Sequence, residues 1–306
     1  MSKKHTKTSV PLRSLTDFVE EFDRYFSGST QLKCYRGQRD SSWPNVAGIF
    51  RPDFKELLED EKRAVRKLIS VQPHEFASDE TMFDKLVRMQ HFGLPTRLLD
   101  VSRNALVALF FATDPGAPCS SKPTDGLVTA FAIPPELEKY YDSDSVSCIA
   151  NLANMTAEEK AKILKESLTE DLSETRTVNL FNKDDAVKRL LQFIRAEKSY
   201  FLPIMNPLDL FVPYFVHPKM SNRRILAQSG AFILYGIKPP KTMFFPYQIE
   251  ETKFIVPKGV KSSIREALDN IGINDSTLFP EIDKAAAWIK NSYSRSSASG
   301  TKTETG

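Results

Sequence analysis

The tripeptide Tyr35-Arg36-Gly37 is the first place where side chains of the sequence could carry chemistry. It ends the short stretch 32–37, which is typical of a strand, and the glycine lets the backbone turn or approach a ligand closely. A planar guanidinium at this point can bind a phosphate or diphosphate through two parallel charge-assisted hydrogen bonds. The sequence leaves the alternative open that Arg36 only pairs with a carboxylate at the strand end.

A second candidate is the segment 90–103, in which polar side chains interrupt an apolar stretch. Burying such groups without partners costs about 1–3 kcal/mol each, so we expect them to bond to one another or to a ligand. Arg97 and Asp100 could form a buried ion pair that holds a loop. A triad of Ser102, His91 and Asp100 is formally available, but no elbow glycines surround the serine, which is more typical of a helix cap.

The third candidate segment is 222–232. Gln228 directly precedes an apolar strand and could present its amide to a ligand. Gly230 leaves space beside it, and Phe232 offers a ring face. The alternative is a turn that only starts a strand.

Helices and strands must position these segments, and both are indicated by hydrophobic periodicity and capping residues. The helix that follows segment 90–103 is expected to begin near Arg103, with Asp100 or Ser102 as its cap. Because the two kinds of element do not alternate regularly, the fold class is α+β, with a helical insertion at about 140–200. Helices are expected at 14–26, 79–92, 103–112, 156–168, 184–198, 263–271 and 280–290, and strands at 32–37, 126–133, 231–237 and 253–256.

Composition limits the classes of protein that the chain can belong to. Its 306 residues carry a net charge of +3, with 41% hydrophobic and 26% charged residues, which is typical of a globular protein. No apolar run approaches the roughly 20 residues of a membrane-spanning helix, and the basic, polar start does not resemble a secretory signal. We therefore expect a cytoplasmic protein without membrane contact, with disordered tails at 1–12 and 292–306 around one domain at 13–291.

Metal chemistry and several common enzyme classes have no support in the sequence. The cysteines, Cys34, Cys119 and Cys148, and the four histidines are too scattered for a zinc site, so no metal is expected. The chain has no phosphate-binding P-loop, no Rossmann glycine motif and no nucleophile elbow. No cluster of acidic residues indicates a metal-dependent nuclease.

Five motifs in sequence order resemble the FRG domain family, which is named for its Phe/Tyr-Arg-Gly motif. The resemblance extends over about residues 30–290, and the long second motif makes it specific. It implies a bacterial protein in a phage-defence or toxin–antitoxin setting. The motifs are Tyr35-Arg36-Gly37 and the runs 90–102, 108–112, 224–232 and 278–283.

The layout is also similar, more distantly, to the arginine-class mono-ADP-ribosyltransferases, which implies a split β core surrounded by helices. By this resemblance Arg36 binds the NAD diphosphate and Gly37 bonds the nicotinamide amide. Ser102 supports the nicotinamide ribose or orients the arginine, and Gln228 takes the third motif position. That class carries a glutamate two residues later, where this chain has Gly230, so Asp100 is the expected substitute. The other NAD-binding residues implied are Tyr35, His91, Thr96, Arg97 and Phe232.

These implications give a leading hypothesis and an alternative. The first is an FRG-domain effector that transfers ADP-ribose from NAD to a nucleic acid, such as mRNA, or to a protein, as an anti-phage toxin with an antitoxin as a candidate partner. The alternative is a non-catalytic module of a defence system that binds a nucleotide or a phage component. The missing glutamate favours the alternative.

Overall fold

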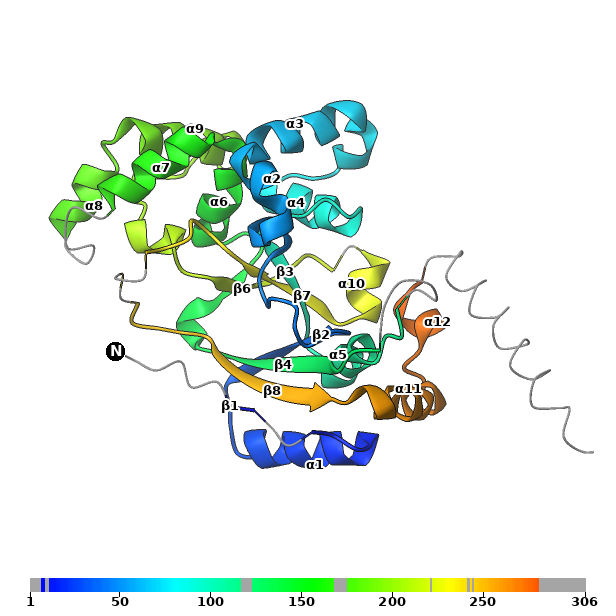
Figure 1. The fold of residues 1–306 in the computed structure, drawn as a ribbon. Coiled ribbons are helices and arrows are strands. Elements are labelled where there is room, and N and C mark those ends of the chain that lie inside the picture. The colour runs from blue at the N-terminus through cyan, green and yellow to red at the C-terminus, as the bar shows by residue number, and fades with distance from the viewer. Residues whose placement is uncertain are drawn as a thin grey trace, which may run out of the picture.

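The chain folds into a mixed α/β structure around one open sheet (Figure 1). The computed structural model describes residues 7–8, 11–116, 123–167, 175–220, 222–240, 243 and 245–280. These ranges contain twelve α-helices and eight strands. None of those helices is long and apolar enough to cross a lipid bilayer.

The sheet is antiparallel except at its two edges, where β1 runs parallel to β8 and β5 runs parallel to β6. Its strands lie side by side in the order β1 (Lys7–Thr8), β8 (Glu250–Val256), β4 (Gly126–Ile133), β2 (Leu32–Gln38), β3 (Leu98–Ser102), β7 (Gly230–Leu234), β6 (Tyr214–His217) and β5 (Glu138–Tyr140).

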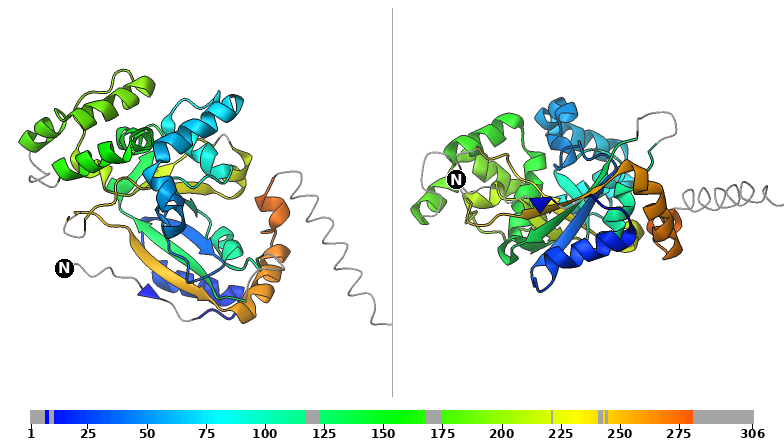
Figure 2. Two further views of the ribbon diagram at one scale, coloured as in Figure 1. Left: turned by 45° about the horizontal axis from the view of Figure 1, so that its top comes forward. Right: turned by 60° about the horizontal axis from the view of Figure 1, so that its bottom comes forward.

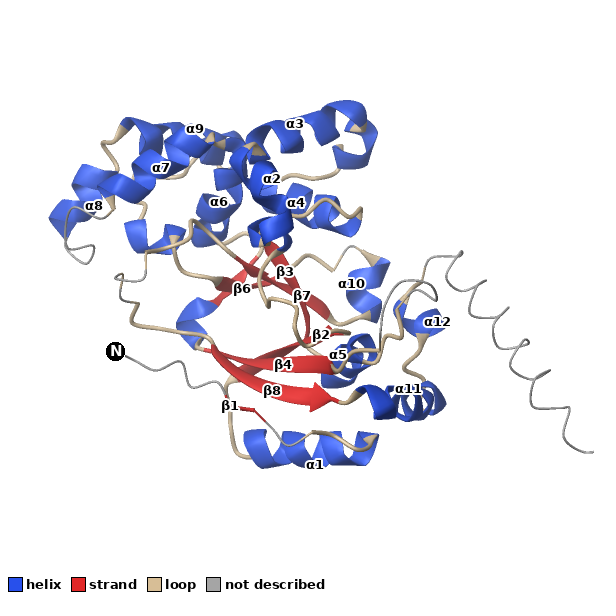
Figure 3. Ribbon diagram, in the orientation of Figure 1, coloured by secondary structure: helices blue, strands red, loops and turns tan. Residues whose placement is uncertain are grey.

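The sheet is nearly divided between β2 and β3. Strand β2 pairs with β4 along its whole length, from Leu32 opposite Ile133 to Gln38 opposite Leu127. It pairs with β3 at one position alone, Tyr35 opposite Ser102. On either side of this pair the strands separate, so the sheet has two halves that run in different directions in Figure 3. A split of this kind opens a space inside a sheet that would otherwise be closed.

Two hydrophobic cores pack against the sheet, and at β2 they lie on opposite faces, because Cys34 belongs to the larger core and its neighbour Tyr35 to the smaller. The smaller core is covered by α1 (Leu15–Phe26), α5 (Ala105–Ala112) and α11 (Lys261–Asn270), with α10 (Arg223–Ala227) and α12 (Asp275–Leu278) beside them. The larger core is covered by α2 (Lys55–Glu59), α3 (Glu61–Val71), α4 (Met82–His91), α6 (Asp144–Ala150), α7 (Ala157–Glu166), α8 (Thr175–Phe181) and α9 (Asp185–Glu197). Figure 2 shows α7 to α9 well away from α11.

Capping residues fix the ends of several of these helices, as the sequence predicts. The Ser14 hydroxyl accepts a hydrogen bond from the Asp17 backbone N–H at the start of α1, at 3.1 Å. Thr156 forms a full capping box with Glu159 at the start of α7, and Asp184 caps α9. Such caps satisfy backbone donors that have no partner inside the helix.

Other expected caps and ends are wrong. Asn104 caps α5, whereas Asp100 and Ser102 belong to strand β3, which the sequence analysis treats as a loop. Helix α11 begins at Lys261, before the expected start at residue 263, and has no side-chain cap; the Ser263 hydroxyl lies inside the helix and donates to the Val260 carbonyl. The expected helix at 280–290 and the tail at 292–306 lie outside the described residues.

The expectation of a disordered tail at 1–12 is also wrong for residues 7–8 and 11–12. Strand β1 extends the sheet beside β8. The Leu12 backbone N–H donates to the Ile255 carbonyl at 3.0 Å, and the Leu12 side chain is 1% exposed. The backbone of β8 thus provides hydrogen-bond partners for β1, and the buried Leu12 side chain adds an apolar contact with the smaller core.

Candidate functional site

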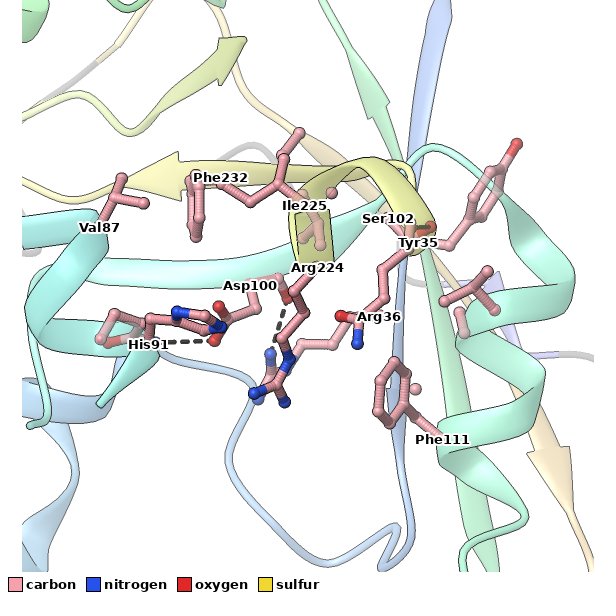
Figure 4. A pocket seen from close by; sticks show the side chains of 18 of the residues that line it. Tyr35, Arg36, Val87, His91, Asp100, Ser102, Phe111, Arg224, Ile225 and Phe232 are labelled. Carbon is pink, nitrogen blue, oxygen red and sulfur yellow. Dashed lines mark hydrogen bonds between the residues drawn. The ribbon is translucent and has the colours of Figure 1, made fainter. Parts of the chain in front are cut away.

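A cavity of about 300 Å³ lies at the split of the sheet, between β2, β3 and β7 and the helices α4, α5 and α10 (Figure 4). It brings together the three candidate segments of the sequence, although 197 positions separate Tyr35 from Phe232. Thr96 and Arg97 do not line it. The candidate residues that do are Tyr35, Arg36, Gly37, His91, Asp100, Ser102, Gln228 and Phe232.

Arg36 crosses the split from β2 to β3. One guanidinium nitrogen, Nη1, donates to the backbone carbonyl of Asp100 at 2.7 Å. Its Nε is buried and, within the described residues, has no hydrogen-bond partner. Burial lowers the pKa of Arg36, the nearby charge of Arg51 lowers it further, and Asp100 acts in the opposite direction. No carboxylate in the described ranges forms an ion pair with Arg36, so the guanidinium keeps donors for an anion.

Gly37 holds β2 against α5. A Cβ atom at this position would lie 1.8 Å from the Ala108 carbonyl oxygen and 2.9 Å from the Ala112 nitrogen. Because both contacts are with backbone, no side-chain movement relieves them. The glycine therefore has a packing role that fixes where Arg36 starts, whatever it does toward a ligand.

The side chains of Ser102 and Gln228 bond backbone groups. The Ser102 hydroxyl donates to the Gln228 carbonyl at 2.7 Å and accepts from the Asn104 N–H at 2.9 Å. The Gln228 side-chain amide donates to the Leu278 carbonyl at 3.0 Å. The imidazole of His91 lies 3.1 Å from the Asn222 side chain. The structure thus gives Ser102 no bond to His91, and the triad is not assembled.

Asp100 is the one acidic residue among the described residues that line the cavity. Its carboxylate accepts a hydrogen bond from the Gln90 side chain at 2.7 Å. Gln90 also accepts from the Thr96 hydroxyl at 2.9 Å, so it fixes the turn before β3 as well as the carboxylate. Gln90 was not predicted as a site residue, although it is the first polar residue of the 90–103 segment.

The expected ion pair between Arg97 and Asp100 is wrong. Arg97, 1% exposed, pairs with Glu61 through two hydrogen bonds of 2.7 and 2.5 Å and donates to the Gly236 carbonyl at 2.8 Å. Lys160 bonds the same carboxylate at 2.8 Å. Burial alone would raise the pKa of Glu61, but the two cations hold it below its usual value. Arg97 therefore has a structural role away from the cavity.

An aromatic wall beside the cavity, formed by Phe111 and Phe279, was not predicted; Phe279 itself does not line the cavity. Phe111 lines the cavity and meets Phe279 edge-on, with ring centroids 6.1 Å apart. The guanidinium of Arg224, which also lines the cavity, lies 5.0 Å from the Phe279 ring centre. The wall joins α5, α10 and the segment after α12, so it depends on tertiary contacts that the sequence does not display.

Of the comparisons with known proteins, one matches a part of the chain that forms this site. No curated protein and no solved structure matches the chain significantly. A family model matches residues 31–119, which span β2, α4, β3 and α5 and include Arg36, Asp100 and Ser102. Gln228 and the aromatic residue Phe279 lie outside the match. Over residues 31–119 the chain carries an FRG domain, in agreement with the resemblance found in its motifs.

Proposed function

We propose that this protein is an NAD-dependent mono-ADP-ribosyltransferase that acts as an effector toxin in bacterial anti-phage defence. The observation that carries the proposal is the guanidinium of Arg36, which reaches the cavity without a carboxylate partner among the described residues. A diphosphate bears the charge and the oxygen geometry that such a group binds best.

The charges around the cavity support an anionic ligand. The Arg36 guanidinium lines it without an ion-pair partner, and Asp100 carries the one carboxylate among the lining residues that the structure describes. The apolar residues on its walls reduce the local dielectric constant, which strengthens attraction between the guanidinium and a bound diphosphate. The ring of Phe111 provides a flat surface for a heterocycle.

The proposed reaction breaks the bond between the ribose C1′ and the nicotinamide nitrogen. Nicotinamide leaves with the electron pair of that bond, and the ribose becomes cationic and oxocarbenium-like. The Asp100 carboxylate, held by Gln90, would stabilise this positive charge. An acceptor group on a nucleic acid or protein then attacks C1′ and loses a proton.

A second candidate function is a non-catalytic module that binds a nucleotide. The observation that favours it is that Ser102 and Gln228, which occupy the transferase motif positions, both bond backbone carbonyls. With no glutamate in the third motif, Asp100 alone would have to support the transition state.

Nicotinamide release separates the two functions. The purified protein is incubated with labelled NAD and lysate, with parallel samples treated with nuclease or protease. For a transferase, label enters one macromolecular fraction. Arg36→Ala then weakens NAD binding by about a hundredfold, whereas Asp100→Asn binds NAD but releases nicotinamide at least about a hundredfold more slowly. A protein that binds nucleotides and releases no nicotinamide is a binding module, and the transferase proposal is then wrong.

A further inference from the structure

A hydrogen bond between His91 and Asn222 joins two helices at the wall of the cavity. His91 is the last residue of α4, and Asn222 is the cap directly before α10. Both residues line the cavity, and Asn222 Nδ2 lies 3.1 Å from His91 Nδ1. The two residues are 131 positions apart in the chain, so the contact exists only in the folded protein.

The cap of α10 fixes which atom of the Asn222 amide faces His91. The side-chain oxygen Oδ1 accepts a hydrogen bond from the Arg224 backbone N–H at 2.8 Å. The NH2 group of an amide cannot take that place, because it donates and does not accept. The group directed at the imidazole is therefore the NH2, and Asn222 donates to His91.

A donor from Asn222 determines where His91 carries its proton. Nδ1 accepts this hydrogen bond through its lone pair, so Nδ1 has no proton, and the proton of the neutral ring is on Nε2. A protonated ring would direct an Nδ1–H at the Asn222 NH2, which places two donors against each other. A hydrogen bond of this kind favours the neutral imidazole over the imidazolium.

The charges around His91 give this neutrality a use. A protonated His91 would add a cation to the cavity and compete for the Asp100 carboxylate, which Gln90, the residue before His91, holds at 2.7 Å. Among the described residues, the charged side chains that line the cavity with His91 are Arg36 of β2, Asp100 of β3 and Arg224 of α10. On α4 itself, Arg88 pairs with Asp79, and Asp84 pairs with Lys219.

Resting on the proposed function, we propose that Asn222 is a positioning residue that keeps His91 neutral, with its proton on Nε2, so that Asp100 stays available to the cationic ribose. His91 is then not the base of the reaction, because Nδ1 is engaged and Nε2 is already protonated. When the acceptor group attacks C1′ and the new bond forms, the proton that it loses passes to the Asp100 carboxylate.

Nitrogen NMR of the full chain, labelled with ¹⁵N at histidine, tests the proton position directly. The sequence has four histidines, and the spectrum of His91→Gln identifies the signals of His91. At neutral pH we expect Nδ1 of His91 to have the chemical shift of an unprotonated ring nitrogen and Nε2 that of a protonated one. This measurement needs neither NAD nor activity.

Asn222→Asp should reverse the preference. The aspartate keeps an oxygen for the cap of α10 but turns a carboxylate oxygen toward Nδ1, so the pH at which His91 becomes protonated should rise by about one unit or more. The matched control is Asn206→Asp. Asn206 also caps a short helix, through the Leu208 N–H at 3.0 Å, but it does not line the cavity, so its substitution should leave the His91 titration unchanged.

Nicotinamide release connects the proton position with the reaction. In the wild type, release should fall about tenfold as the pH is lowered through the range in which NMR shows His91 becoming protonated. This fall should move to higher pH in Asn222→Asp, by the shift that NMR measures. It should be absent in His91→Gln, whose side chain does not titrate.

The outcomes separate this inference from the proposed function. A wild-type His91 that is charged at neutral pH, or that carries its proton on Nδ1, overturns the inference, and so does an unchanged titration in Asn222→Asp. A fall in release that persists in His91→Gln overturns it as well. If the NMR results are as expected and no nicotinamide is released from NAD at any pH, the neutral His91 stands while the transferase proposal fails.

Discussion

At the scale of single residues, the chemistry depends on how Arg36 is held. Its side chain is fixed at one end by the β2 backbone and at the other by the Asp100 carbonyl, at 2.7 Å. This arrangement orders a long, flexible side chain before any ligand arrives. A ligand that bonds the remaining donors therefore avoids most of the entropy loss of ordering an arginine.

Substitution of Arg36 should reveal a geometric requirement rather than a requirement for positive charge. Arg36→Lys keeps the charge but loses the planar fork, so we expect NAD affinity to fall about tenfold, and by about a hundredfold in Arg36→Ala. Titration calorimetry measures both. Arg103→Ala is the control. Arg103 directly follows the cavity-lining Ser102, but its own side chain is exposed and does not line the cavity. An equal loss in Arg103→Ala would mean that only the overall charge matters.

Gln90 should affect the reaction more than binding. Gln90→Leu removes the 2.7 Å bond to the Asp100 carboxylate while conserving volume. If that carboxylate stabilises the reacting ribose, its misplacement should slow nicotinamide release by about tenfold to a hundredfold. The dissociation constant for NAD should change less than twofold, because Gln90 does not hold Arg36. A parallel loss of NAD affinity would contradict this positioning role.

At the scale of elements, the helices with capping signals were predictable and the strand that carries the site was not. Ser14, Thr156 and Asp184 identify helix starts from local sequence alone. Strand β3 holds Asp100 in a run of five residues with four buried, and the preceding Pro95 suggests a loop. What makes it a strand is its pairing with β7, more than a hundred residues away. Local patterns do not encode such pairing.

The site shows the same division between local and distant information. The sequence singles out eight residues that the structure places around one cavity, because most of them stand out locally as polar or small in an apolar setting and Phe232 as a ring beside a glycine. It assigns Arg97 a partner three residues away, whereas the actual partner, Glu61, lies 36 positions earlier in α3. Spacing along the chain predicts partners within a helix or turn, but not between elements that meet in the core.

No side chain at Gly37 should fit between β2 and α5 without disturbing their packing. We expect Gly37→Ala to lower the free energy of unfolding by about 3 kcal/mol, because the added methyl group meets backbone atoms of Ala108 and Ala112. Urea denaturation measures the change. Gly259→Ala is the matched control, since a Cβ at Gly259 meets nothing within 4 Å. If the two variants have the same urea midpoint, the packing role assigned to Gly37 is wrong.

At the scale of the whole molecule, a buried group of charges connects distant parts of the chain. Glu61 in α3 bonds Arg97, in the turn before β3, and Lys160 in α7. The Glu61 carboxylate thus connects the segment that leads to the site, through Arg97, with one of the helices between β5 and β6, through Lys160. Two cations share one anion, so the three charges sum to +1, and burial lowers the pKa of Lys160.

This arrangement predicts that the three members contribute unequally to stability. Glu61→Gln leaves two buried cations without a counter-charge and should reduce the free energy of unfolding by about 3–5 kcal/mol. Lys160→Met leaves the two-bond pair of Arg97 and Glu61 neutral overall, so its effect should stay below about 1 kcal/mol or be stabilising. The control is Lys188→Met, which breaks an exposed pair with Asp185 and should change little. Equal destabilisation by the first two variants would contradict the charge balance.

The same carboxylate predicts how stability depends on pH. The pKa of Glu61 is lower in the folded chain than in the unfolded chain, because Arg97 and Lys160 outweigh its burial. The unfolded state therefore binds the proton more readily, and Glu61 stabilises the fold at a pH above its unfolded pKa of about 4.5. This contribution is lost as the pH falls from there through the lower folded pKa. Denaturation midpoints between pH 7 and pH 3 should thus fall more steeply for the wild type than for Glu61→Gln, and parallel curves would show that Glu61 is not the group responsible.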